Sequence, residues 1–417
     1  MYKRLISFLK KHNILYDYQF GFRENHSTDM ALICLMEKLA KALDSNEIVI
    51  GLFLDLSKAF DTVNHEILLD KLNFYGIRGI ALEWFRSYLS NRSQYVSYNS
   101  TNSNYKIIIC GVLQGSILGP LLFLLYVNDL YNISKELFFI LFADDTNVFL
   151  SHKDAKYLND LMNNELKKVS KWFKVNKLSV NIKKTKFMVF TNRKRFTLND
   201  FEISLDGQNI TCVDKIKFLG VYIDHKLNWK FHINYISDKL AKSVGILCKA
   251  RKVLTKSVLL DLYYAFCFPY FSFGNIVWAS NYKTNIYPLV VLQKKLVRII
   301  NFMKPTEHTA LIFKQMGILN VLDINKFQVC MFMFKAVNKQ LPGIFDSMFT
   351  SNKMIHNYNT RQSQNLHMPK CRTNFSKFCM SYRGPEIFNS LPNELKNIQI
   401  LNKFKVQLKL HFIGYYI

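Results

Sequence analysis

The sequence predicts a mixed α/β (α+β) fold, and three observations carry that prediction. Two apolar runs, 48–54 and 138–143, have the length and composition of buried strands, and acidic residues follow each of them directly. Apolar residues recur at helical spacing over 25–43, 155–175 and 233–254. With 417 residues, 49% of them hydrophobic, the chain is long enough to form two or three domains.

The predicted elements follow one another closely. After the strand ending at Asp55 we expect a loop and then a helix that Asp61 or Thr62 caps and that stops near Gly76. A glycine-bearing loop then leads into an apolar, buried helix with Pro120 in its first turn. The remaining expected elements are a hairpin at 138–150, a helix at 155–175, a strand at 186–191, a strand pair around 218–223, a basic amphipathic helix at 233–254 and a mainly helical region beyond 300.

Charge and cysteine content narrow the function classes. Fifty-six Lys and Arg against thirty Asp and Glu give a net charge of +26, which favours a polyanionic partner, nucleic acid ahead of an acidic membrane surface. The eight cysteines lack zinc-site spacing and are predicted to be reduced, mostly buried thiols. No signal-peptide pattern opens the chain. The apolar stretch 258–279 contains Asp261 and Pro269 and is predicted to be a buried helix and turn, with no stable membrane association.

The adjacent pair Asp144 and Asp145 is the strongest chemical feature. Two carboxylates side by side where a strand turns back repel each other, so we expect a cation to hold them. Asp55, at the end of another apolar strand, supplies a third carboxylate. Hard divalent ions such as Mg²⁺ prefer such oxygen ligands, and two such ions stabilise phosphoryl transfer.

Seven ordered segments resemble the reverse transcriptases of non-LTR (LINE-type) retrotransposons, especially jockey-like elements. They are QFGFR at 19–23 with Ser27 and Thr28, LFLDLSKAFD at 52–61, GVLQGSILGP at 111–120, FADD at 142–145, LSVN at 178–181 with Lys184 and Thr185, FLG at 218–220, and Trp229 with His232 and Ile233. The resemblance implies a right-hand polymerase fold. It divides the chain into partial fingers and palm at 1–230, a helical thumb at 231–300, and a C-terminal region of unknown role at 301–417.

The resemblance also implies a catalytic set. Asp55 and Asp144 would ligate two Mg²⁺ ions, with Mn²⁺ as a substitute, while Asp145 supports them and the Leu56 carbonyl joins the metal shell. Lys184 would protonate or neutralise the departing pyrophosphate, although a solvated run of lysines is the alternative. Asp61 is interpreted as a helix cap and not as a metal ligand.

Further residues are implied to contact substrates. Phe60 would be the steric gate that selects dNTPs, with an ordinary core Phe as the alternative. Gln114 and Gly115 would lie beside the nucleotide and template, or form a plain helix-entry turn. Arg23 would contact nucleotide or template, or pair with a palm carboxylate. A primer grip is implied at Phe218, Leu219 and Gly220, and nucleic-acid contact, or a solvated helix face, at Lys239, Lys242, Lys249 and Lys252.

The expected function is therefore RNA-directed DNA synthesis with an RNA template, a DNA primer and dNTPs. An intracellular location is expected, in the nucleus during target-primed synthesis and otherwise in the cytoplasm. The chain starts just before Gln19, so we expect an N-terminally truncated family member that lacks part of the fingers. Two alternatives stay open: a catalytically lapsed relic that binds nucleic acid, and an RNA-dependent RNA polymerase that uses Asp55 and Asp61 around the ribose.

Overall fold

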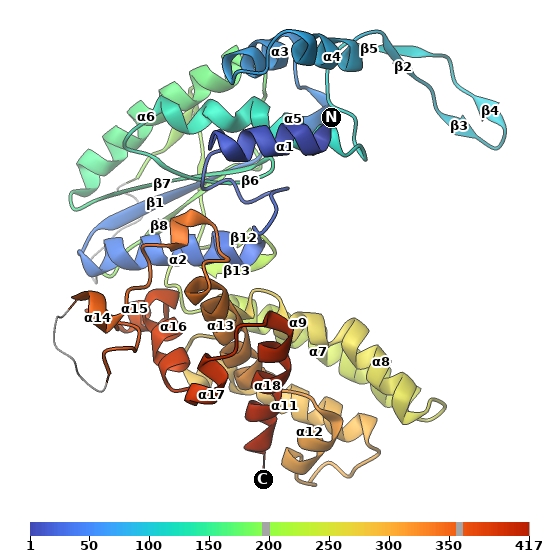
Figure 1. Ribbon diagram of the computed structural model, residues 1–417, viewed down its shortest axis with the longest axis vertical. Helices are drawn as coiled ribbons and strands as arrows, with labels where there is room; N and C mark the ends of the chain where they lie inside the picture. The colour runs from blue at the N-terminus through green and yellow to red at the C-terminus, as the bar shows by residue number, and fades with distance from the viewer. Residues whose placement is uncertain (194–200, 356–361, 417) are drawn as a thin grey trace. The chain divides into compact units, whose positions relative to one another are not determined.

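A computed structural model describes residues 1–193, 201–355 and 362–416 (Figure 1). The chain divides into two compact units. The first contains residues 1–27 and 46–213, and the second contains 28–45 and 214–417. These units do not coincide with the three expected regions, whose functional division remains a prediction.

A five-stranded sheet forms the centre of the first unit. Its strand order is β11 (Thr211–Cys212), β8 (Lys186–Phe190), β1 (Ile48–Leu54), β7 (Asp145–His152) and β6 (Phe138–Phe142). Strand β1 is antiparallel to both of its neighbours, and every residue in it is buried. Because side chains alternate along a strand, Ile50, Leu52 and Leu54 all point into the main core of this unit. The strand thereby ends with Asp55 at the margin of the core.

Helices and short strands complete the first unit. The helical segments are α1 (Tyr2–Lys11), η1 (Ala59–Asp61), α3 (His65–Phe74), α4 (Ile80–Leu89), α5 (Leu118–Val127), η2 (Asn128–Ile133) and α6 (Ala155–Val175). Two-residue strands pair as β9 (Ser204–Leu205) with β10 (Gln208–Asn209). A separate ribbon consists of β2 (Arg92–Gln94), β3 (Ser97–Tyr98), β4 (Thr101–Asn102) and β5 (Lys106–Ile108). Helix α5 is apolar on all sides and almost completely buried, as the sequence predicts.

The second unit is mainly helical. It contains α2 (Thr28–Asp44), the hairpin β12 (Lys215–Phe218) and β13 (Val221–Asp224), α7 (Lys230–Ala250), α8 (Lys256–Phe266), α9 (Phe268–Ser272), α10 (Asn275–Trp278), α11 (Lys283–Ile300), α12 (Ala310–Met316), α13 (Val321–Val337), η4 (Gly343–Phe345), α14 (Asn352–Ile355), α15 (Asn374–Phe378), α16 (Met380–Asn389), α17 (Asn393–Lys396) and α18 (Leu401–Gly414). Helix α2 packs against α10, α15 and α16, so a segment near the N-terminus is part of the core of the C-terminal unit.

Most element predictions are confirmed, with one clear error. The predicted helices at 25–43 and 155–175 and the predicted hairpin are present. The cap of the helix after Asp55 was assigned wrongly. Asn64, not Asp61 or Thr62, caps α3, because its side chain accepts a hydrogen bond from the Ile67 N–H at 3.1 Å. Asp61 instead ends the 3₁₀ turn η1.

The expectations for the cysteines and for the apolar stretch 258–279 can be compared with the structure. All eight cysteines are free thiols, but only four of them are buried: Cys34, Cys267, Cys330 and Cys379. The apolar stretch 258–279 breaks into α8, α9 and α10, and among the described residues no helix has the length and apolar character needed to cross a bilayer.

Candidate active site

Strand register brings the three predicted carboxylates to one edge of the sheet. Leu54 on β1 lies opposite Thr146 on β7, so the next residue along, Asp55, is directed toward Asp145. Phe142 pairs with Asp145 across the β6–β7 hairpin. The tight turn between them therefore consists of Ala143 and Asp144 alone.

The electrostatics of Asp145 reflect this convergence. Asp145 is solvent-exposed, yet partial burial of its carboxyl group raises its pKa to about 6, and the charges of Asp144 and Asp55 add to the rise. Three acids thus share one region of negative potential. In the described part of the chain, no group of three or more His, Cys, Asp and Glu side chains can hold a metal by itself. Carboxylate oxygens are the donors that hard divalent ions such as Mg²⁺ prefer, and Mg²⁺ is usually bound by one or two carboxylates together with substrate phosphates.

The segment that follows α6 anchors Asp55. The Asn181 N–H donates to the Asp55 carbonyl at 2.7 Å, and the Asp55 N–H donates to the Thr185 hydroxyl at 3.3 Å. Thr185 is completely buried, so this contact fixes the backbone at the end of β1. Lys184 Nζ lies 3.7 Å from Asp55 Oδ2. Among the neighbouring lysines it is therefore Lys184 whose side chain reaches a catalytic candidate, although both partners are exposed and the ion pair is weak.

Gln19 holds the acidic turn, a role that the sequence analysis missed. Its buried amide accepts from the Ala143 N–H at 2.9 Å and donates to the Ala143 carbonyl at 3.4 Å, while also accepting from the Gly21 N–H. Ala143 has φ +56°, a strained value for a residue with a side chain. Any Cβ on Gly21 would lie 2.2 Å from the Ala143 nitrogen. The sequence signal for this role is a single polar residue, Gln19, between the aromatic residues Tyr18 and Phe20.

Phe60 lies on the same unit beside the apolar helix. Its ring stacks on Phe123 of α5, with the centroids 4.3 Å apart, and meets Phe22 edge-on at 6.1 Å. The loop before α5 is hydrogen-bonded to the backbone around Phe60. Val112 N–H donates to the Phe60 carbonyl at 2.9 Å, and Gly111 N–H donates to the Val63 carbonyl at 2.7 Å.

Gln114 and Gly115 project from this loop. Gln114 donates to the Asp61 carboxylate at 2.8 Å. Gly115 has φ +82°, a conformation that favours glycine, and a Cβ there would meet open space. Gly111, in contrast, has no room for a side chain, because a Cβ would lie 2.8 Å from the Asp61 carbonyl oxygen. The loop therefore connects Phe60, Asp61 and Gln114 in one hydrogen-bonded structure.

Arg23 makes structural contacts. Its guanidinium donates to the backbone carbonyls of Tyr16 at 2.6 Å and Gln19 at 3.2 Å. Burial lowers its pKa, with the nearby Asp17 acting in the opposite direction. Arg23 thus binds the segment that carries Gln19, and its predicted contact with nucleotide or template remains a prediction.

The other predicted contacts belong to the second unit. Phe218 ends β12, while Leu219 and Gly220 form the hairpin turn, with φ +44° and +85°. A Cβ on Gly220 would lie 2.6 Å from the Phe273 ring, so glycine is required there. The four predicted nucleic-acid lysines are Lys239, Lys242 and Lys249 on α7 and Lys252, which follows the end of that helix.

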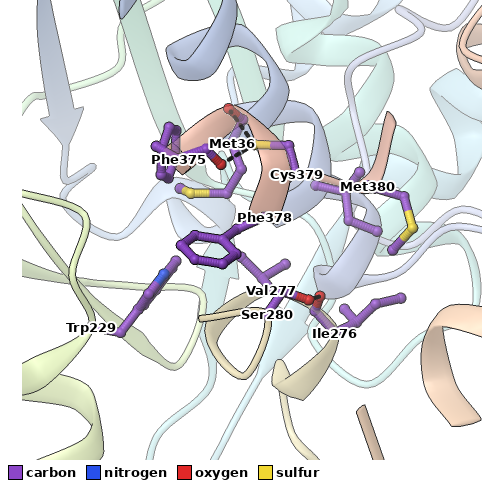
Figure 2. A pocket seen from close by; sticks show the side chains of 10 residues that line it. Met36, Trp229, Ile276, Val277, Ser280, Phe375, Phe378, Cys379 and Met380 are labelled. Carbon is purple, nitrogen blue, oxygen red and sulfur yellow. Dashed lines mark hydrogen bonds between the residues drawn. The ribbon is translucent and has the colours of Figure 1, made fainter. Parts of the chain in front are cut away.

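A small cavity in the second unit has the character of a packing gap. It encloses about 20 Å³ and is lined by apolar side chains that include Met36, Trp229 and Phe378 (Figure 2). The Cys379 thiol beside it contacts the carbonyls of Met36 and Phe375. A space of this size has room for about one water molecule, so it is not a substrate site.

Comparison with known proteins identifies the family. Residues 1–223 match the family described as "Reverse transcriptase (RNA-dependent DNA polymerase)". This match covers more than half of the chain, which therefore belongs to the reverse transcriptase family. The predicted class of fold, a right-hand polymerase of mixed helix and sheet, agrees with that membership.

The relatives are retrotransposon proteins, which confirms the predicted resemblance to jockey-like elements. The chain is 27% identical over 337 residues to a probable RNA-directed DNA polymerase from transposon X-element of Drosophila melanogaster, covering 78% of this chain and 36% of that protein. It is 28% identical over 294 residues to the RNA-directed DNA polymerase from mobile element jockey of the same species, covering 68% and 32%. The chain thus spans about a third of the length of these curated relatives.

Solved telomerase structures are also similar. Apo telomerase from Candida tropicalis aligns with a TM-score of 0.43 and 13% identity, covering 75% of this chain and 50% of that chain. An overlap of this extent adds nothing to the family assignment.

Proposed function

We propose that this chain is the RNA-directed DNA polymerase of a non-LTR retrotransposon, adding dNTPs to a primer 3′-hydroxyl on an RNA template. One observation carries the proposal. The ends of β1 and of the β6–β7 hairpin bring Asp55, Asp144 and Asp145 to one edge of the sheet. Burial raises the pKa of Asp145 to about 6, and the charges of Asp144 and Asp55 add to the rise. Family membership and the names of the relatives support the choice of reaction.

The carboxylates define where divalent ions would bind. Asp55 and Asp144 are the proposed ligands, with Asp145 as a supporting charge. The Leu56 carbonyl is a further ligand in this proposal. The isolated bridge between Leu56 and Val180, with hydrogen bonds from the Asn181 N–H to the Asp55 carbonyl and from the Ser57 N–H to the Ser179 carbonyl, fixes the backbone there. Two Mg²⁺ or Mn²⁺ ions held by these residues would activate the 3′-hydroxyl and neutralise charge on the phosphates.

The surrounding side chains have proposed roles in positioning substrates. Lys184, held near Asp55, would stabilise the charge of the departing pyrophosphate. The Phe60 ring, braced by Phe123, would exclude a ribose 2′-hydroxyl. Gln114 and Gly115 would contact the nucleotide and template. The primer grip at residues 218–220, nucleic-acid contact by the four lysines on and after α7, and location in the nucleus during synthesis are further parts of the proposal.

Primer extension tests the proposal. Wild-type chain with an annealed RNA template, DNA primer, dNTPs and Mg²⁺ is expected to extend the primer, whereas Asp144→Asn should slow extension by about a hundredfold or more. Asp160→Asn, an exposed carboxylate on α6, is the matched control and should retain the wild-type rate. Equal extension by both variants would remove the catalytic assignment.

The two alternatives give different outcomes in the same assay. An RNA-dependent RNA polymerase would incorporate rNTPs as well as dNTPs, whereas the proposed gate predicts that only Phe60→Ala gains rNTP incorporation. A catalytically lapsed relic would bind RNA in a salt-sensitive way without any extension.

A further inference from the structure

A β-ribbon in the first unit has no role in the proposed chemistry. Strands β2 and β5 pair antiparallel, with Arg92 opposite Ile108 and Gln94 opposite Lys106, and β3 pairs with β4 beyond them. Figure 1 shows this ribbon extending away from α4. All the residues of its four strands are exposed except Ile108, which is half-buried. The ribbon is therefore a projecting arm and contributes little to the core.

The arm carries exposed aromatic rings. Tyr95 keeps 45%, Tyr98 75% and Tyr105 71% of its surface accessible. The rings of Tyr95 and Tyr105 lie against each other, with centroids 4.9 Å apart. Exposed aromatic side chains on an extended ribbon are platforms on which unpaired nucleic-acid bases stack, whatever their sequence.

The charge of the arm is complementary to nucleic acid. Residues 88–110 contain two cations, Arg92 and Lys106, and no Asp or Glu. Arg92 stacks on the Tyr88 ring, with its guanidinium carbon 5.5 Å from the ring centroid. Cations interleaved with aromatic rings, in a segment free of carboxylates, favour a phosphate-bearing strand.

A hollow lies between the arm and the loop that carries Gln114. Its volume is about 640 Å³, and its lining includes Arg92 and Lys106 on the arm, His65 at the start of α3, and Gln114 on the loop. The only carboxylate in the lining is Asp61, which already accepts a hydrogen bond from Gln114. His65 Nε2 lies 2.8 Å from the Gly111 carbonyl, which fixes the loop to α3. The wall therefore combines two cations and several polar side chains with the aliphatic residues of β5 and of the loop, and it includes the predicted template contact Gln114.

We propose that the arm and this hollow bind the single-stranded part of the RNA template as it approaches Gln114. Arg92 and Lys106 contact backbone phosphates, and the arm's tyrosines stack with unpaired bases. This assignment rests on the proposed function for the identity of the strand as template. The binding surface itself is defined by charge, aromatic exposure and the hollow.

RNA binding by the full chain tests the inference directly. Fluorescence anisotropy with a labelled single-stranded RNA, over a range of salt concentrations, compares three variants. Arg92→Ala with Lys106→Ala should weaken binding by about tenfold and reduce the salt slope by about 1.4, because each phosphate contact to a single strand contributes about 0.7. The triple variant Tyr95→Ala, Tyr98→Ala, Tyr105→Ala should weaken binding with an unchanged slope. Lys167→Ala with Lys171→Ala removes two exposed α6 lysines and should bind like wild type.

Measurements of melting temperature, RNA binding and primer extension on the arm variants distinguish a failure of this inference from a failure of the proposed function. The arm variants should melt at the wild-type temperature, and, where extension occurs, they should raise KM for template and leave kcat unchanged. Selective loss of RNA binding in a chain without polymerase activity would uphold the arm and reject the polymerase. Arm variants that bind single-stranded RNA as the α6 control does would overturn the inference. So would a change in oligomeric state with RNA affinity intact, which would identify the arm as a protein contact.

Discussion

At the scale of single residues, the acidic turn depends on neighbours that carry no charge. Ala143 adopts a left-handed backbone conformation that costs free energy, and the Gln19 amide satisfies both of its backbone groups. Gly21 leaves the space that this contact needs. The acids themselves are evident from the sequence, because carboxylates after apolar runs are unusual. The roles of Gln19 and Gly21 are not evident from the sequence, because the residue that they contact lies more than a hundred positions away.

Gly21→Ala tests this support. The added Cβ would lie 2.2 Å from the Ala143 nitrogen, so the turn must move or the 18–21 segment must detach. We expect a loss of about 1–3 kcal/mol in free energy of unfolding and a larger loss of primer extension. Gly245→Ala is the matched control, because that glycine has open space around it in α7 and alanine favours a helix. Equal stability and activity for the two variants would show that the turn does not need the close approach.

At the scale of elements, the local sequence pattern predicts which helices and strands exist better than it predicts where they begin and end. The 138–150 hairpin and the 155–175 helix follow from apolar spacing alone. The first residue of α3 cannot be predicted in this way, because Asp61, Thr62 and Asn64 are all good capping residues within four positions. A 3₁₀ turn at Ala59–Asp61 uses the first of these and moves the helix start to His65. Tertiary hydrogen bonds from the 111–112 backbone hold that turn in place.

Asn64→Ala should weaken the N-terminus of α3. Its side chain accepts from the Ile67 N–H, so removing it is expected to cost about 1 kcal/mol. Hydrogen exchange at the first α3 amides reports this locally. Asn64→Asp keeps an acceptor and should preserve protection. Unchanged exchange in Asn64→Ala, or equal exposure in both variants, would show that the cap lies elsewhere.

At the scale of the whole molecule, the sequence order does not reveal the division into units. Helix α2 precedes β1 directly, yet it belongs to the unit formed by residues 214–417. Its burial in that unit depends on contacts with α10, α15 and α16, which are hundreds of residues away. The basic composition and the seven motifs predict the family. They do not predict that the proposed primer-grip residues and the acidic turn occur in separate compact units.

Stability of the second unit should fall in acid through His232. Burial, then the charge of Lys217, lowers the pKa of His232 from 6.5 to about 4, and its Nδ1 accepts from the Tyr222 N–H. Since the unfolded chain binds the proton more readily, the contribution is complete above about pH 6.5. It is lost as pH falls toward 4, by about 3 kcal/mol in all.

Comparison with a variant isolates this effect. Burial raises the pKa values of Asp29 and Glu37, so these carboxyl groups stabilise the folded state more as the pH falls, opposite to His232. The measured dependence of unfolding free energy on pH is therefore the sum of the two effects. Denaturation of the wild type and of His232→Gln between pH 7 and pH 4 should give a steeper decline for the wild type. Parallel curves would mean that His232 does not titrate differently in the two states.

The most direct test of the central claim is single-turnover primer extension by Asp55→Asn. The substitution keeps the shape of a side chain at the end of β1 and removes its charge. With an RNA template, dNTPs and Mg²⁺, we predict nucleotide addition about a hundredfold slower or more, with RNA binding unchanged, while Asp70→Asn, an exposed acid on α3, extends normally. Extension by Asp55→Asn at the rate of Asp70→Asn would contradict the account.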